Sequence, residues 1–340
     1  MLRWLRRDPP PLPHAVPNPP RARAGDDAAP PNAELLLRRL EWSVLRRLDG
    51  MLQGDYRTLL RGSGLDLADL REYQLHDDVR HIDWNVSARM QTPYVRVFTE
   101  DREMAAWFLL DLSASVDFGS GRHAKRQVSA EFVAVLARLL TRHGNRVGAL
   151  LYGAGVEKMI PARASRTHVL HLLHAIRHRP APAAPTARTT TRLSDLLLAA
   201  ANATRRRSTI FVVSDFISEP GWEKPLAQLA TRHEVVAVRL LDPLELELPD
   251  LGLLTLRDAE TGEHLLVDTH DPRFRRRFAA IAAQREAELR AALARAGVDT
   301  LELSTEDDLA SAIVRFTEMR RQRARLAAGG GMPAHLRKSA

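Results

Sequence analysis

The sequence predicts an α/β fold built on a doubly wound, mostly parallel sheet. Short and almost continuous apolar runs alternate with amphipathic helical segments through the middle of the 340-residue chain. Strands that are covered by helices on both faces have such unbroken apolar runs, and their alternation with helices is typical of parallel α/β sheets. In these sheets, ligands bind beyond the carboxyl ends of the strands, where the strand order switches. We therefore expect a functional site at the ends of the strands.

The expected strands and helices follow one another along the chain. Strands are predicted at residues 107–110, 147–152, 210–214, 235–240 and 300–303. Helices are predicted around residues 128–139, 168–176, 193–203 and 274–293, where apolar residues recur at helical spacing. Two apolar runs around a Gly-containing turn predict a β-hairpin inserted at residues 244–270.

Composition and pattern divide the chain into four parts. Residues 1–33 are rich in Pro, Ala and Arg, so we expect a disordered lead. A helical pattern begins at Glu34 and opens an N-terminal region over residues 34–100. Residues 101–320 are expected to form the α/β domain with its inserted hairpin. Residues 321–340 are expected to be a flexible tail.

Composition also excludes several classes of protein. The chain has no cysteine, which excludes disulfides and thiolate chemistry. Its apolar runs are far shorter than the roughly 18 residues of a membrane span, and no secretory signal is recognisable, so we expect a cytoplasmic protein with no integral membrane segment. The net charge is +8, and only four of the 50 basic residues are lysine. Arginine richness permits a nucleic-acid partner, but aromatic residues at 5% offer little for bases to stack on, so nucleic-acid binding is not favoured.

Oxygen-bearing side chains follow two of the expected strands. Asp111, Ser113 and Ser115 come directly after the first strand, and Asp215 follows a later one, with a threonine-rich loop at residues 189–191 between them. Carboxylate and hydroxyl oxygens suit Mg²⁺, which needs few protein ligands because it keeps several waters. The pattern indicates a candidate Mg²⁺ site. The alternative is that the two serines cap the following helix and the aspartate bonds to backbone.

The order of these side chains resembles the metal-ion-dependent adhesion site of von Willebrand factor type A domains. The resemblance implies five metal-site residues: Asp111, Ser113, Ser115, Thr191 and Asp215, the last acting through water. Thr190 is an equally placed hydroxyl, so the choice between the two threonines stays open. Arg192 stands where that site usually has an acidic or amide residue, and its guanidinium would weaken a cation site unless it points away.

Further segments resemble the signature of the bacterial family called domain of unknown function 58, in which this signature precedes a von Willebrand A-like domain. They lie at residues 62–66, 71–74, 76–85, 87–89, 94–98, 242–245 and 258–263. The resemblance spans residues 50–320. It implies a working association with MoxR-type AAA+ ATPases, in chaperone-like remodelling or in maturation of a client protein.

Two other clusters have a simpler structural interpretation. Residues 77–84 hold three aspartates and end at Trp84. We favour an ion-paired turn with Trp84 packed against the main sheet over a docking surface or a second cation site. His168, His171, His174 and His178 share one helical segment, but no acidic residue completes a set of metal ligands nearby, which favours a solvated or partly packed face.

The sequence offers no pattern for catalysis. It contains no Gly-x-Ser-x-Gly elbow, no Walker loop and no His-Glu-x-x-His motif, so we predict that the protein is not an enzyme. The leading hypothesis is a Mg²⁺-dependent protein–protein interaction adaptor that works with a MoxR-type AAA+ ATPase or its client. The alternative is an arginine-rich module that binds nucleic acid or acidic proteins and has a vestigial metal site, which a steep salt dependence without Mg²⁺ dependence would favour.

Overall fold

The computed structural model of the chain describes residues 33–48, 69–74, 79, 82–97, 105–121, 123–178, 191–257 and 264–329. Of the lead expected at residues 1–33, only Ala33 lies within these ranges. Of the tail expected at residues 321–340, only the part up to residue 329 does. That part is helical, because α10 spans Leu309–Gly329 and runs past the boundary expected at residue 320.

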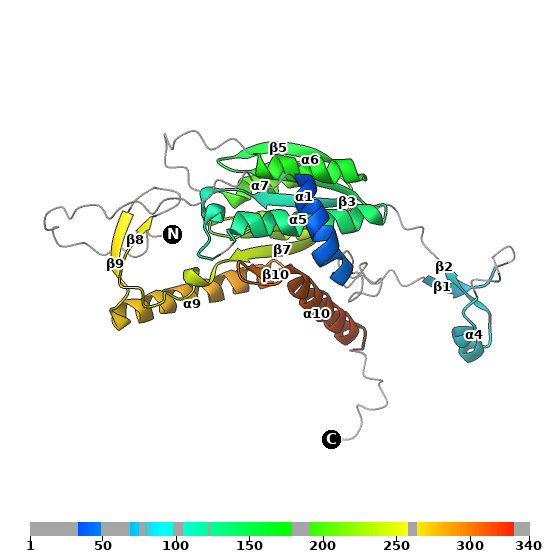
Figure 1. The fold of residues 1–340 in the computed structure, drawn as a ribbon. Coiled ribbons are helices and arrows are strands. Elements are labelled where there is room, and N and C mark those ends of the chain that lie inside the picture. Colours follow the sequence, from blue (N-terminus) through cyan, green and yellow to red (C-terminus); the bar gives the residue numbers. More distant parts are fainter. Residues whose placement is uncertain are drawn as a thin grey trace, which may run out of the picture.

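A six-stranded sheet forms the centre of the described structure, with the strand order β10-β7-β6-β3-β4-β5 (Figure 1). Its members are β3 (Ala105–Asp111), β4 (Arg146–Tyr152), β5 (Val156–Arg163), β6 (Thr209–Ser214), β7 (Glu234–Leu241) and β10 (Asp299–Ser304). Five strands are parallel, and β5 pairs antiparallel with β4 at one edge. The predicted doubly wound, mostly parallel α/β fold is confirmed. The sequence pattern missed β5, because this edge strand buries only Ile160 and has no apolar run.

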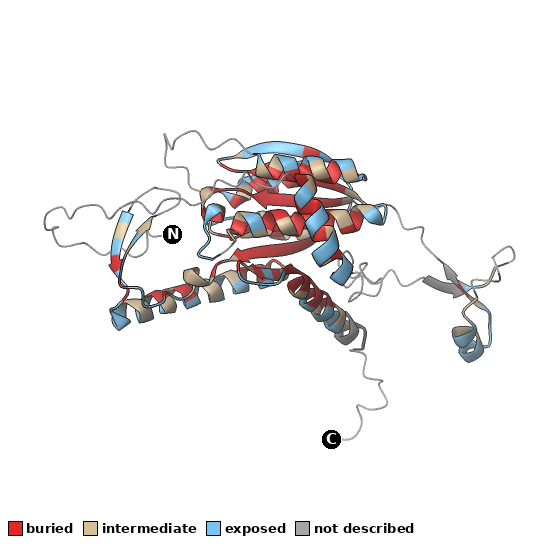
Figure 2. Cartoon of the chain, viewed as in Figure 1, coloured by how far each residue is buried: buried red, intermediate tan, exposed pale blue. Residues whose placement is uncertain are grey.

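Helices cover both faces of the sheet, which is why β6 is buried along its whole length. One face lies under α1 (Ala33–Leu40), α5 (Lys125–Arg142), α6 (Arg166–Arg177) and α10. The other lies under α7 (Leu193–Ala203), α8 (Glu223–Arg232) and the last turns of α9 (Pro272–Arg295). Each face has its own cluster of buried apolar side chains, and Figure 2 shows the inner strands of the sheet as buried and the edge strand β5 as largely exposed.

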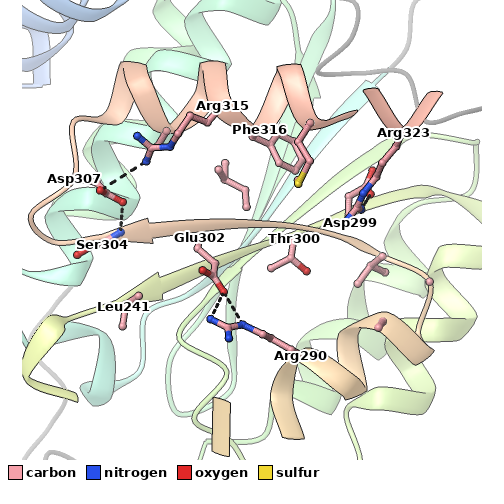
Figure 3. A pocket seen from close by; sticks show the side chains of 16 residues that line it. Leu241, Arg290, Asp299, Thr300, Glu302, Ser304, Asp307, Arg315, Phe316 and Arg323 are labelled. Atoms are coloured by element: carbon pink, nitrogen blue, oxygen red, sulfur yellow. Dashed lines mark hydrogen bonds and ion pairs between the residues drawn. The ribbon is translucent and has the colours of Figure 1, made fainter. Parts of the chain in front are cut away.

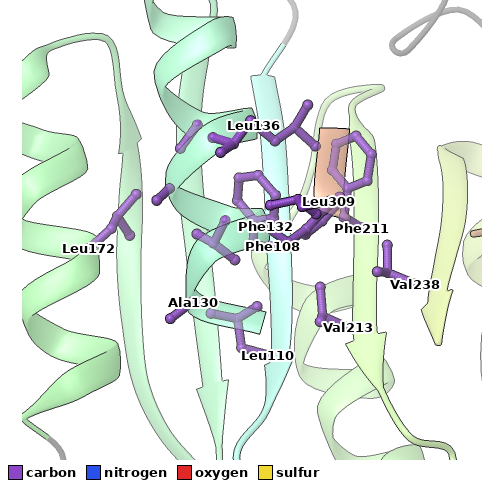
Figure 4. Close-up of a cluster of buried hydrophobic side chains, with 14 of the residues drawn as sticks. Phe108, Leu110, Ala130, Phe132, Leu136, Leu172, Phe211, Val213, Val238 and Leu309 are labelled. Atoms are coloured by element: carbon purple, nitrogen blue, oxygen red, sulfur yellow. The ribbon is translucent and has the colours of Figure 1, made fainter. Parts of the chain in front are cut away.

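Three phenylalanines anchor the cluster beneath α5 (Figure 4). Phe108 on β3 and Phe211 on β6 are partners across the parallel pair, and their rings stack with centroids 5.3 Å apart. Phe132 of α5 meets both rings nearly edge-on, at 6.3 Å from Phe108 and 6.1 Å from Phe211. These contacts lock α5 onto the two strands whose ends carry the candidate site.

The first helix packs on the α/β domain. From α1 the chain continues through a π-helical turn, Glu41–Leu45, and its buried leucines join the cluster beneath α5 and α10. Glu34 pairs with Arg166 of α6, and Glu41 pairs with Arg138 of α5. Residues 33–48, the first part of the N-terminal region expected at residues 34–100, therefore bury their apolar face against the domain.

A small antiparallel pair lies apart from the main sheet in Figure 1, between β1 (Asp69–Glu72) and β2 (Tyr94–Val97). Between these strands, Asp83 caps helix α4 (Trp84–Met90) by accepting hydrogen bonds from the backbone N–H groups of Asn85 and Val86. Trp84 is 71% exposed, so the expectation that it packs against the main sheet is wrong. It stands at the first position of a helix that buries none of its residues. Asp77 and Asp78 lie outside the described residues.

The hairpin expected after β7 forms from β8 (Leu253–Arg257) and β9 (His264–Asp268), which pair antiparallel. It is followed directly by α9, whose first turn is capped by Asp271. Among the helices that the structure describes, none is long and apolar enough to cross a membrane.

Candidate functional site

The site residues lie at the carboxyl ends of two adjacent parallel strands. β3 ends at Asp111, and β6 is followed by Asp215. From β3 the chain passes to β4 on one side of the sheet, and it later returns to β6 on the other side. The strand order therefore switches between β3 and β6, which is where open α/β sheets bind their ligands.

The loop after β3 gathers three buried oxygen-bearing side chains. Asp111 is fully buried, and Ser113 and Ser115 are only 5% and 6% exposed. One carboxylate oxygen of Asp111 accepts a hydrogen bond from the backbone N–H of Ser113 at 3.0 Å. The hydroxyl groups of Ser113 and Ser115 are hydrogen-bonded to each other, with their oxygens 3.1 Å apart. Ser113 flanks the short helix Ala114–Asp117 without a side-chain capping bond. Of the alternative interpretation, the bond from Asp111 to backbone is therefore present, whereas a capping bond from Ser113 is not.

The loop after β6 is tied to the loop after β3. Ser214 donates its hydroxyl hydrogen bond to the second carboxylate oxygen of Asp111 at 2.7 Å. Asp215 is 3% exposed, and its Oδ1 accepts from the backbone N–H of Ile217 at 3.0 Å. Ser214 was not singled out from the sequence, although its place beside Asp215 at a strand end was the available signal.

Thr191 lies two residues before α7 and is 4% exposed. Its carbonyl oxygen accepts hydrogen bonds from the hydroxyl of Ser218 and from the backbone N–H of Glu219, both at 2.9 Å. Arg192 sends its guanidinium to the carboxylate of Glu219 at 2.9 Å and is 61% exposed. Its charge is therefore taken up by a surface ion pair. Thr190 lies outside the described residues.

A buried lysine completes the site. Lys125, at the start of α5, is fully buried, and its Nζ lies 2.6 Å from Oδ2 of Asp215 and 2.7 Å from Oε1 of Glu245. Glu245 comes from the segment after β7, where it forms a capping box with Asp242. Sequence analysis missed both residues as site residues. The available signal for Lys125 was that it is one of only four lysines in an arginine-rich chain.

The buried charges at this site do not balance. Asp111, Asp215 and Glu245 are three carboxyl groups against the single ammonium of Lys125. Burial, with the neighbouring Asp215 carboxylate adding to it, raises the pKa of Asp111 to about 6. Burial opposes the charge of Lys125, but Asp215 and Glu245 outweigh it and raise the lysine pKa. Burial also raises the pKa of Glu245, against the opposing effect of Lys125. The site thus favours additional positive charge.

The donor set fits Mg²⁺ at the loop after β3. Two ligands at right angles on an octahedral Mg²⁺ ion, each about 2.1 Å from it, lie about 3 Å apart. The separation of the Ser113 and Ser115 hydroxyl oxygens, 3.1 Å, agrees with this spacing. No cluster of three or more His, Asp or Glu side chains in the described residues could hold a metal ion. Any metal there would depend on the hydroxyls. Asp215 is engaged by Lys125, so it would act at longer range.

The histidine segment has a structural role. His168 is buried, and its Nε2 lies 2.8 Å from the carbonyl oxygen of Val147 on β4. The rings of His174 and His178 stack with centroids 4.0 Å apart. These contacts agree with the partly packed helix face favoured from the sequence.

Fold and site together define a class: an α/β domain with a buried, oxygen-lined loop at the strand-order switch of a mostly parallel sheet. The family profile described as "Protein of unknown function DUF58" matches residues 69–288. An uncharacterized protein of Mycobacterium tuberculosis (strain ATCC 25618 / H37Rv) is 38% identical over 309 residues, which cover 91% of this chain and 96% of that protein. The chain belongs to the DUF58 family.

Solved structures with a similar arrangement include BatB from Bacteroides thetaiotaomicron, a conserved hypothetical protein. It is 13% identical, with a TM-score of 0.40, and the match covers 64% of this chain and 99% of BatB. The von Willebrand A domain of SpRpn10 is 14% identical, with a TM-score of 0.34, and the match covers 62% of this chain and 93% of that domain.

Proposed function

We propose that the protein is a non-enzymatic adaptor that uses a Mg²⁺ ion at the loop after β3 to bind a partner protein. The observation that carries the proposal is the pair of buried hydroxyl oxygens of Ser113 and Ser115, held 3.1 Å apart at the strand-order switch. Asp111 lies beside them, and burial, with a smaller contribution from the Asp215 carboxylate, raises its pKa to about 6. This combination of hard oxygen atoms and excess negative charge suits a divalent cation.

The roles of the residues follow from their positions. Ser113 and Ser115 would bind the ion directly, with Thr191 from the neighbouring loop as the third hydroxyl. Asp111 would neutralise its charge while Ser214 and the Ser113 N–H hold the carboxylate in place. Asp215 would act through water, since Lys125 occupies one of its oxygens. When bound, the ion supplies an open coordination position that a carboxylate of the partner can fill.

The partner in this proposal is a MoxR-type AAA+ ATPase, or a client that such an ATPase remodels or matures. The family resemblance supports this choice of partner, and an acidic side chain on the partner is what an open Mg²⁺ position would recognise. The sequence contains no Gly-x-Ser-x-Gly elbow, Walker loop or His-Glu-x-x-His motif, which supports the proposal of binding over catalysis.

The test uses the full-length protein, immobilised, and a purified MoxR-type ATPase from the same genome. Four samples are compared: wild type in Mg²⁺, wild type in EDTA, Asp111→Ala in Mg²⁺, and Asp117→Ala in Mg²⁺. Asp117 is the matched control, because it lies in the same loop but is half exposed and pairs with Arg126. We expect the ATPase to be retained only by wild type in Mg²⁺ and by Asp117→Ala in Mg²⁺. Calorimetric titration should show Mg²⁺ binding to wild type and Asp117→Ala but not to Asp111→Ala.

Other results would change the assignment. Retention of the ATPase in all four samples would support the adaptor role and contradict its dependence on Mg²⁺. No retention in Mg²⁺, together with binding of nucleic acid that falls steeply with salt, would support the alternative of an arginine-rich binding module. If Asp111→Ala fails to fold, the double variant Ser113→Ala and Ser115→Ala removes the two hydroxyls without leaving a charge unpaired.

A further inference from the structure

The outer edge of β10 is open in the described structure. In the strand order, β10 has β7 as its neighbour on one side and no strand on the other side among the described residues. A groove of about 850 Å³ runs along this edge. Figure 3 shows the groove between α9, which contributes Arg290, and α10, which contributes Arg315, Phe316 and Arg323.

The main chain of β10 directs hydrogen-bonding groups into this groove. The N–H of Thr305 donates to the carbonyl of Leu241 on β7 at 3.0 Å. Because successive residues of a strand point their N–H and C=O groups to opposite sides, the main-chain groups of Leu301 and Leu303 also face β7. The main-chain groups of Thr300, Glu302 and Ser304 face outward. The Ser304 N–H is taken by the Asp307 carboxylate at 3.2 Å, which leaves the main-chain groups of Thr300 and Glu302 facing the groove.

The side chains along the groove have a definite chemistry. On α10, Ala312, Phe316 and Met319 line the groove at helical spacing. Ala312 and Phe316 are only 2% and 3% exposed, so the partly buried Met319 provides the accessible apolar surface. Three arginines stand at the rim: Arg290, Arg315 and Arg323. Each is more than 60% exposed, and each pairs with a less exposed acid: Glu302, Asp307 and Asp299. Arg290 also lies 3.8 Å from Glu286. A guanidinium has five N–H donors, and these contacts leave donors directed to solvent.

We infer that this edge binds an extended peptide of a partner protein as a seventh strand of the sheet. In an added strand, alternate side chains face α10 and the others face α9. Arg315 and Arg323 are eight positions apart on α10, which is about 12 Å along the helix axis, with Met319 midway between them. About four residues of extended chain cover that distance. A peptide with two acidic residues four positions apart and an apolar residue midway between them therefore presents all three side chains to α10, opposite Arg315, Met319 and Arg323.

The geometry favours this occupant for a physical reason. Main-chain pairing supplies affinity that does not depend on sequence, and alternate side chains supply the specificity. The groove offers both, since two outward-facing residues present main-chain groups and the walls differ in chemistry. The inference does not depend on the metal site, because β10 lies at the edge of the sheet, with β7 and β6 between it and β3.

The experiment selects from a library of random dodecapeptides with the full-length protein as bait, in EDTA. We expect enrichment of peptides that carry two acidic residues four positions apart with an apolar residue midway between them. Thr300→Pro removes an outward N–H that makes no bond within the sheet, and edge strands tolerate proline there. It should weaken binding of the selected peptides at least tenfold, while Thr300→Ala, which keeps the N–H, should not. Double reversal, Arg315→Glu with Arg323→Glu, should have a similar effect to Thr300→Pro.

A change in the peptide keeps the test valid if Thr300→Pro fails to fold. N-methylation of alternate amides of a selected peptide removes strand pairing without touching the protein, and it should abolish binding. The inference is overturned if no peptide is enriched, if selected peptides bind Thr300→Pro or their methylated forms as well as the reference, or if they are basic. A wild-type dimer that Thr300→Pro dissociates would also overturn it, since a second copy would then cover the edge.

Discussion

The Nζ of Lys125 lies 2.6 Å from Oδ2 of Asp215, and both side chains are buried at the carboxyl edge of the sheet. A cation of the protein itself thus stands beside the last residue of the expected metal site. The lysine also contacts Glu245, so it links the end of β6 to the segment after β7. Any divalent ion at the site must share this space with the ammonium charge.

Replacing Lys125 by methionine should weaken the fold and strengthen metal binding. Removing one member of a buried ion pair leaves the partner charge uncompensated and costs about 3–5 kcal/mol. The free carboxylates of Asp215 and Glu245 would then attract a divalent ion more strongly. Calorimetric titration with Mg²⁺ should show tighter binding to Lys125→Met than to wild type, and Mg²⁺ should raise the melting temperature of the variant more.

Lys158→Met is the matched control, because Lys158 lies exposed on β5, away from the site. It should change neither Mg²⁺ affinity nor melting temperature. Unchanged or weaker metal binding by Lys125→Met would show that the lysine does not compete with a cation.

The fold was largely predictable from sequence because its signals are local. Four of the five parallel strands contain runs of adjacent apolar residues, such as those around Phe108 and Phe211, and the helices that cover the sheet have periodic apolar faces. The order Asp111, Ser113 and Ser115, followed by Asp215, was also readable, because each residue follows a strand directly. Their burial and the close approach of the serine hydroxyls agree with that pattern, while metal binding itself stays a prediction.

The parts that the sequence did not predict depend on long-range contacts. Lys125 meets Asp215 and Glu245 across separations of 90 and 120 residues, and no local pattern encodes such a meeting. The packing of α1 and the π-helical turn after it on α5 and α6 depends on partners more than 90 positions away. Glu41 of that turn, for example, pairs with Arg138. Trp84 is a contact that was expected and is not formed. Its large aromatic side chain suggested burial, but it is exposed on α4.

Asp242 should be a major contributor to stability. This fully buried carboxylate accepts hydrogen bonds from the hydroxyl and N–H of Ser120, the hydroxyl of Thr305 and the N–H of Leu244. Burial raises its pKa, but these donors outweigh burial and lower it. Asp242→Asn should reduce the free energy of unfolding by about 2–4 kcal/mol, because several donors lose a charged acceptor.

Urea unfolding at neutral pH measures this loss. Asp250→Asn, at a half-exposed carboxylate, is the control and should have little effect. One hydrogen bond to a charged group contributes at least about 1.5 kcal/mol. A loss of less than about 1 kcal/mol for Asp242→Asn would therefore contradict this role of Asp242.

Gly148 makes room for the Trp107 ring. A Cβ at Gly148, on β4, would lie 2.9 Å from two ring atoms of Trp107 and 3.0 Å from the carbonyl oxygen of Ile160. Both neighbours lie in packed positions, so Gly148→Ala should destabilise the protein by about 1–3 kcal/mol. Gly121→Ala is the control, since a Cβ there meets nothing within 4 Å. Equal melting temperatures for the two variants would show that the sheet adjusts freely around Trp107.

His233 should make the stability fall in mild acid. It is buried at the start of β7, and its Nδ1 has no hydrogen-bond partner in the described structure, while its Nε2 lies 3.4 Å from the Thr204 hydroxyl. Burial, with Arg232 contributing, lowers its pKa below the ordinary value of 6.5. Below pH 6.5 the unfolded chain therefore takes up a proton that the folded protein does not, and the free energy of unfolding decreases.

Urea unfolding between pH 7.5 and 5.5 tests this dependence on His233. The His233 contribution lowers the midpoint across this range, so the midpoint of wild type relative to that of His233→Gln should fall as the pH falls. Comparing the two proteins isolates this contribution, because burial lowers the pKa of His168 in the same direction, whereas the pKa of Asp111, raised to about 6, acts in the opposite direction over the same range. His264→Gln, on the exposed face of the hairpin, should leave the wild-type dependence unchanged. If the urea midpoint changes with pH to the same extent in wild type and in His233→Gln, His233 does not contribute to the pH dependence. Other groups would then account for the proton uptake.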